Sequence, residues 1–122
     1  NIEAIETLLK YQLPLYHSGW LYIGACLFLE KRPYRDLAYE YICWALEQGK
    51  DLTYLANYVA YVLATGYAPI KHFLEMLDRP NLNIIKGFAN MIINEYLRQV
   101  EGRELPKLHK KLLDYQKEIS HL

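Results

Sequence analysis

Residues 51–66 read DLTYLANYVAYVLATG, and this stretch decides the fold. Its apolar positions recur every three or four residues, which predicts a helix with an apolar side packed on a neighbour. Asp51 is placed to cap the start of this helix and Gly66 to follow its end. No residue between 52 and 65 is charged, so the helix is apolar nearly all round and should lie at the centre of the fold. The apolar stripe consists of Leu52, Leu55, Val59 and Leu63.

Proline and glycine divide the rest of the chain into further helical segments. No stretch shows the sustained alternation of apolar and polar residues that is typical of a strand. At 122 residues the chain has the size of one domain. We therefore expect a single all-α domain over residues 1–122, with six to seven short helices in a bundle or a short superhelix of helical hairpins. The expected helices besides the central one cover residues 2–13 (closed by Pro14), 19–31 (capped by Ser18), 33–46, 70–77 and 82–100, with a last helix that has Pro106 in its first turn.

The charge balance argues against two classes of partner. Acidic and basic residues number 14 each, so no global field attracts nucleic acid or an anionic membrane. A basic group near the C-terminus lacks a helix-turn-helix signature, and nucleic acid is therefore not favoured. The longest apolar run, residues 19–29, is too short to cross a bilayer. The basic group consists of Arg103, Lys107, Lys110, Lys111 and Lys117.

The two cysteines, Cys26 and Cys43, each lie inside an apolar run and form no spacing motif. This pattern favours buried thiols in a reducing compartment, so we expect a cytoplasmic protein. A disulfide between adjacent helices stays open as an alternative. The chain begins at Asn1 without a methionine, as expected of a domain cut from a longer protein at its N-terminus.

The sequence contains no motif that guarantees a catalytic arrangement. It has no HExxH, CxxC, GxSxG, GxxxxGK or GxGxxG, so we predict no catalytic residue, no metal and no cofactor. The histidines lie far apart and are expected at the surface or at helix ends. His17, in the loop LYHSGW, is expected to cap a helix. The four histidines are His17, His72, His109 and His121.

One pair of carboxylates shares a helical face. Asp36 and Glu40 are four residues apart, a spacing that suits metal binding or a shared proton. Arg32 and Arg35 lie beside them, so local charge pairing is the stronger expectation.

Two neighbouring helical segments look alike. LAYEYICWALEQG (37–49) and LANYVAYVLATG (55–66) both begin with Leu-Ala and end at a glycine. The combined stretch AYEYICWALEQGKDLTYLANYVAYVLATGYA, residues 38–68, resembles a Sel-one-like repeat, a relative of the tetratricopeptide repeat. The resemblance implies a helical hairpin, although the spacing after Gly49 is about three residues longer than in that family.

Tyrosine is unusually common, with 12 residues against 3 phenylalanines. Tyr54, Tyr58 and Tyr61 form a second stripe on the central helix, and Tyr39, Tyr41 and Tyr67 are placed to extend it. Rings that line a groove and keep their hydroxyls in water make good anchors for a peptide or a helix. We therefore predict that these six tyrosines bind a partner. The alternative is a core built from tyrosine in place of phenylalanine.

The last helix carries the spacing of a coiled-coil seam. Its apolar residues alternate three and four apart, and the opposite face is charged. The seam predicts a homodimer or contact with a partner helix, and the alternative is an arm folded back on its own bundle. The seam residues are Leu105, Leu108, Leu112, Tyr115 and Ile119, followed by Leu122.

These features favour a non-enzymatic helical module that binds another protein, or its own copy, through a tyrosine-rich face. Two other classes stay open. The first is an inhibitor or immunity-type protein that blocks a partner protein. The second is a small-ligand binder or enzyme whose pocket is formed by tyrosine, His17 and Trp20.

Overall fold

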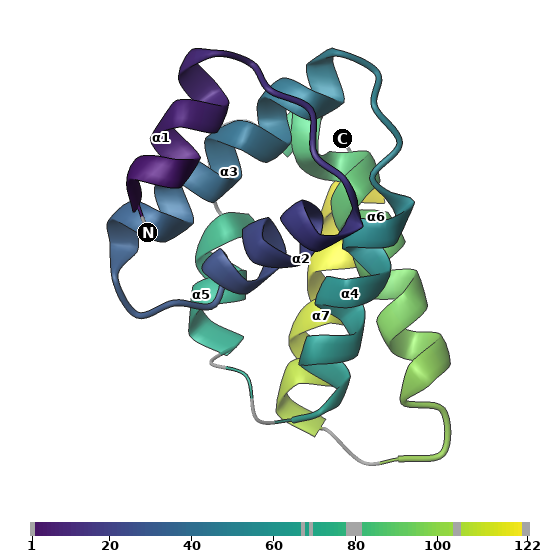
Figure 1. The fold of residues 1–122 in the computed structure, drawn as a ribbon. Helices are drawn as coiled ribbons and strands as arrows, with labels where there is room; N and C mark the ends of the chain where they lie inside the picture. Colours follow the sequence, from purple (N-terminus) through teal and green to yellow (C-terminus); the bar gives the residue numbers. More distant parts are fainter. Residues whose placement is uncertain (1, 67, 69, 78–81, 104–105, 121–122) are drawn as a thin grey trace.

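The computed structural model describes residues 2–66, 68, 70–77, 82–103 and 106–120. Within these ranges the chain forms seven α-helices packed together and no strand, so the predicted all-α class is confirmed (Figure 1). None of the described helices is both long and apolar enough to cross a membrane. The helices are α1 Ile2–Lys10, α2 His17–Cys26, α3 Arg32–Glu47, α4 Thr53–Ala64, α5 Ile70–Leu77, α6 Leu82–Gln99 and α7 Pro106–Ser120.

The helix α4 is central, as its sequence predicts. It contacts α2 on one side and α6 on the other, and Figure 1 shows it between these two helices. The helix α1 packs on α3, while α5 and α7 pack on α6. The buried residues of α4 are Leu55, Ala56, Val59, Ala60, Leu63 and Ala64.

The close approach of α2 to α4 depends on a glycine. A Cβ atom added at Gly24 would lie 2.9 Å from Cδ1 of Tyr58 and 3.1 Å from Cδ1 of Leu55. These distances are shorter than ordinary van der Waals contact, so a larger residue would push the two helices apart. Gly24 therefore fixes how deeply Tyr58 sits beside α2.

Local signals set the ends of α4. The carboxylate Oδ1 of Asp51 accepts hydrogen bonds from the backbone N and the Oγ1 of Thr53, at 2.9 and 2.6 Å. Asp51 therefore bonds to the first helical residue from one position before the N-cap, which is Leu52 and makes no side-chain capping bond, so the prediction that Asp51 is the cap was wrong by one residue. Gly66 has a φ of 76°, and such a left-handed residue ends a helix at little steric cost when it is glycine.

Helix α1 is shorter than expected, and helix α2 both begins and ends earlier than expected. The helix α1 ends at Lys10 because Gln12 takes a φ of 50° and the Leu13 amide bonds back to the Leu8 carbonyl at 3.0 Å. The helix α2 begins at His17 and ends at Cys26. Ser18 thus lies inside the first turn, and the prediction that it caps α2 was wrong.

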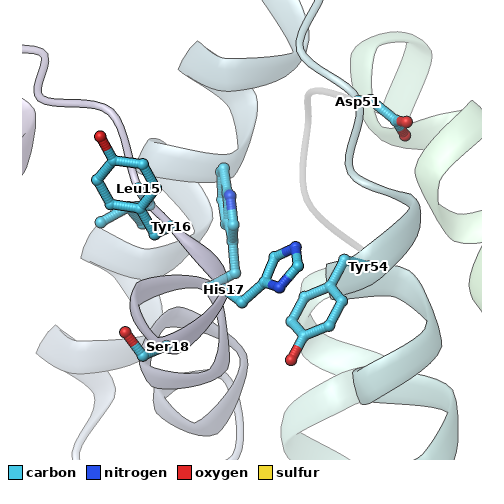
Figure 2. A pocket seen from close by; sticks show the side chains of 7 residues that line it. Leu15, Tyr16, His17, Ser18, Asp51 and Tyr54 are labelled. Carbon is cyan, nitrogen blue, oxygen red and sulfur yellow. The ribbon is translucent and has the colours of Figure 1, made fainter.

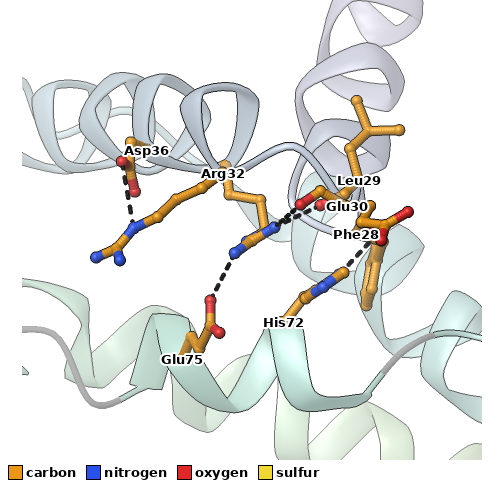
Figure 3. Close-up of polar contacts among 8 residues, drawn as sticks. Phe28, Leu29, Glu30, Arg32, Asp36, His72 and Glu75 are labelled. Atoms are coloured by element: carbon orange, nitrogen blue, oxygen red, sulfur yellow. Dashed lines mark hydrogen bonds and ion pairs between the residues drawn. The ribbon is translucent and has the colours of Figure 1, made fainter.

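A buried arginine explains where the chain turns after α2. Nη1 of Arg35 donates to the carbonyl oxygens of Leu29 and Glu30, at 2.8 and 2.7 Å (Figure 3). Its Nη2 donates to Oε2 of Glu75 on α5, at 2.8 Å. The expected pairing of Arg35 with a carboxylate of its own helix was therefore wrong. These bonds tie the 27–31 turn to α3 and α5.

Two other basic side chains near this turn, Arg32 and His72, differ in their surroundings. Arg32 lies 3.6 Å from Asp36, so this pair forms as expected. His72 is buried, with Nδ1 3.1 Å from the Phe28 carbonyl oxygen, whereas a surface position or a helix end was expected. The bond from Arg35 lowers the pKa of the Glu75 carboxyl.

The described part of the seam on α7 faces the chain's own core. Leu112 and Tyr115 are buried in the cluster that also holds residues of α4 and α6. This is the arrangement of an arm folded back on its bundle, so these two residues do not form an open dimer surface. The side chains of Leu105, Leu108, Ile119 and Leu122 lie outside the described residues. Cys26 and Cys43 are buried free thiols, and no disulfide joins them.

Candidate interaction surface

Three tyrosines run along one side of α4. Tyr54 and Tyr61 are 40% and 58% exposed, although they sit on a helix with many buried residues. They are seven residues apart, which is almost two helical turns and places them on the same side. Tyr58 lies between them, turned toward α2 and half-buried. We call Tyr54, Tyr58 and Tyr61 the tyrosine face.

The tyrosines expected to extend this face do not do so. Tyr39 and Tyr41 on α3 are core residues, 5% and 0% exposed, because α3 is covered by α1 on one side and by α2 and α6 on others. The ring of Tyr41 packs against Trp20 and Trp44, and burial raises the pKa of its hydroxyl. Tyr67 lies outside the described residues.

An open hollow of about 580 Å³ lies at the Tyr54 end of the face. Here the rings of His17 and Tyr54 stack with centroids 4.2 Å apart and planes at 12°. Figure 2 shows the two rings side by side, one from the start of α2 and the other from the first turn of α4. We call this the His17–Tyr54 hollow. Its lining is formed by Leu15, Tyr16, His17, Ser18, Trp20, Asp51 and Tyr54.

This hollow changes the interpretation of His17. The residue that precedes α2 is Tyr16, and it makes no side-chain capping bond. His17 is the first residue of the helix, and its ring contact is with Tyr54 rather than with a helix end. The structure does bring His17, Trp20 and Tyr54 around one space, the grouping that the small-ligand alternative requires.

Sequence reasoning missed Tyr16, which is 85% exposed. Its loop is held from inside, because the buried hydroxyl of Tyr41 donates to the Leu13 carbonyl oxygen. Leu15 also packs closely on Gly19, with Cδ2 2.7 Å from where a Cβ of that glycine would stand. An exposed ring on an anchored backbone loses little conformational freedom on binding. The sequence feature that could have indicated Tyr16 is an aromatic residue directly before a helix.

A second open hollow, of about 520 Å³, lies at the Tyr61 end of the face. Nη2 of Arg103 donates to the carbonyl oxygen of Ala64 near the end of α4, at 2.9 Å. This bond ties the residues after α6 to α4. We call it the Tyr61–Arg103 hollow, and its lining is formed by Tyr61, Ala64, Thr65, Gln99 and Arg103.

The charged side chains described in the two hollows, Asp51 and Arg103, both bond to residues of α4. In the first, the hydrogen bonds from the side chain and the backbone of Thr53 lower the pKa of the Asp51 carboxyl. The described residues contain no group of three or more His, Cys, Asp or Glu side chains that could hold a metal ion. Stacked rings and a half-wet surface are instead the features of binding sites.

Comparison with known proteins gives one family. No curated protein and no solved structure matches the chain. The family that does match is not a Sel-one-like or tetratricopeptide family, so the resemblance of residues 38–68 has no support as kinship. The matching family model covers residues 2–121, and the chain therefore belongs to the family described as Domain of unknown function (DUF7825).

Proposed function

We propose that the protein is a non-enzymatic interaction module that holds a segment of another protein on its tyrosine face. One observation carries the proposal. Tyr54 and Tyr61 stay exposed on a helix whose other sides are buried, and each of them lines a hollow. The two buried free cysteines support a reducing compartment such as the cytoplasm as its location.

The rigidity of α4 supports this proposal. The helix packs against α2 and α6, so its backbone should lose little further freedom when a partner binds. A tyrosine side chain has only two rotatable torsions and offers a large amphipathic surface. Such residues are enriched among the few that dominate binding energy. Tyr54 and Tyr61 should therefore be the main anchors.

The test is a selection from a random peptide display library, followed by affinity measurement on variants. Peptides selected by the unchanged protein should bind the double variant Tyr54→Ser/Tyr61→Ser at least about 30-fold more weakly, since truncating one interface hot spot costs about 2 kcal/mol or more. The double variant should remain helical by circular dichroism, because both rings are substantially exposed.

The matched control is Tyr11→Ser. Tyr11 is 62% exposed but lines neither hollow. This variant should keep the affinity for the selected peptides. The proposal is refuted if the double variant binds as well as the unchanged protein, or if the selection yields no binding peptide.

A small-ligand binder is the second candidate function. The convergence of His17, Trp20 and Tyr54 on one hollow favours it. Native mass spectrometry of the protein purified from its source separates the two, because a bound metabolite would appear as a fixed added mass.

A further inference from the structure

The two ends of the tyrosine face differ in charge. Among the described residues that line the Tyr61–Arg103 hollow, Arg103 is the charged one, and it is exposed. Its bond to the Ala64 carbonyl uses one of the five N–H donors of a guanidinium. The remaining donors are enough to receive a carboxylate through two parallel bonds.

Arg103 is held in place by the backbone around it. Its amide donates to the Val100 carbonyl oxygen at 2.8 Å, and the preceding Gly102 turns the chain with a φ of 80°. The guanidinium bond to α4 fixes the far end of the side chain. An arginine anchored at both ends pays little entropy when it binds an anion.

The nearest acidic group of α6 does not compete for Arg103. The carboxylate of Glu95 accepts hydrogen bonds from the guanidinium of Arg98. Its Oε1 also accepts a hydrogen bond from Nε2 of Gln99, at 3.1 Å. These bonds lower the pKa of Glu95 and keep its charge on its own helix. Glu95 is thus paired within its own helix, and Arg103 places a positive charge beside the ring of Tyr61 in this hollow.

We infer that the segment bound on the tyrosine face carries a carboxylate side chain, which Arg103 receives beside Tyr61, and a bulky apolar side chain, which enters the His17–Tyr54 hollow. This inference rests on the proposed function and adds the chemistry of the partner. Charge complementarity sets which end is which, because the carboxylate of Asp51 lines the other hollow and would repel a second carboxylate there.

The spacing of the two hollows gives the spacing of the two side chains. Tyr54 and Tyr61 are seven residues apart on α4, which is about 10 Å along a helix axis. In a polyproline II segment, residues three positions apart lie on the same side and about 9 Å apart, so the apolar residue and the acidic residue should be three positions apart.

A pair of capped peptides tests the inference, Ac-Ala-Trp-Ala-Ala-Glu-Ala-NH2 and the same peptide with Gln in place of Glu. Isothermal titration calorimetry should give the Glu peptide about fivefold higher affinity for the unchanged protein. The preference should vanish in Arg103→Gln. It should persist in Arg32→Gln, which removes an equal charge from α3 outside both hollows.

Each contrary result has one meaning. Equal affinity of the two peptides, a preference that survives Arg103→Gln, or no binding of either peptide would overturn the inference. The proposed function would still stand if library-selected peptides depended on Tyr54 and Tyr61 but not on an acidic residue. It would fall together with the inference only if no selected peptide depended on the two tyrosines.

Discussion

Val59→Asp is expected to abolish the folded state. Val59 is fully buried in the middle of α4, between α2 and α6, so the substitution places a carboxylate where neither water nor a cation reaches it. Burying an unpaired charge costs several kcal/mol, against a total stability of about 5–15 kcal/mol for a domain of this size. Far-UV circular dichroism should show the loss of helix, and the protein should aggregate or elute as an expanded chain.

Asn57→Asp is the control for Val59→Asp. It introduces the same carboxylate two residues away on the same helix, at an exposed position. This variant should keep the native spectrum and a stability within about 0.5 kcal/mol of the unchanged protein, as surface substitutions usually do. A folded Val59→Asp protein would mean that α4 is not the centre of the fold, and the case for the tyrosine face would fail with it.

Tyr41→Ala should lower the free energy of unfolding by about 3–5 kcal/mol, as expected for truncating a buried aromatic ring. The ring of Tyr41 is fully buried between Trp20 and Trp44, and its hydroxyl holds the loop that presents Tyr16. The change removes both the packing and the bond to the Leu13 carbonyl oxygen. Urea denaturation monitored by tryptophan fluorescence would measure the loss.

Tyr41→Phe separates the two contributions. It keeps the ring and removes only the hydroxyl, so the expected loss is about 0.5–1.5 kcal/mol, the net value of one hydrogen bond. If Tyr41→Ala cost no more than Tyr41→Phe, the packing of Tyr41 against the two tryptophans would not contribute as the structure indicates.

Local signals in the sequence carried most of the secondary structure. The sequence predicts the helix between Asp51 and Gly66 from a cap and a terminating glycine. The glycine ends the helix as expected, whereas Asp51 lies one residue before the N-cap and bonds to the first helical residue. The bounds of α5 were also predicted from apolar periodicity between two prolines. The start of α2 was not predictable in this way, because Tyr16 precedes it without any side-chain cap.

Contacts between distant residues were beyond sequence reasoning. Arg35 and Glu75 are 40 residues apart, and nothing in either helix indicates that they meet. The stacking of His17 on Tyr54 likewise depends on how α2 lies against α4, which periodicity does not specify. For this reason His17 was assigned to a helix end, and the hollow that it lines was considered only as an alternative.

The tyrosines show the same limit. A tyrosine at an apolar helical position belongs to the core or to a half-wet surface according to which neighbour covers it. On α4 the spacing correctly placed Tyr54 and Tyr61 on one side, and that side is exposed. On α3, Tyr39 and Tyr41 are two residues apart and do not share one side of the helix, and both are enclosed because three helices pack around them.

Amide chemical-shift mapping with one library-selected peptide tests most directly whether the tyrosine face is the binding surface. The largest shifts should fall on residues that line the two hollows and on Tyr58 between them. Shifts concentrated on α1 and α3, with these residues unchanged, would show that the tyrosine face is not the binding surface.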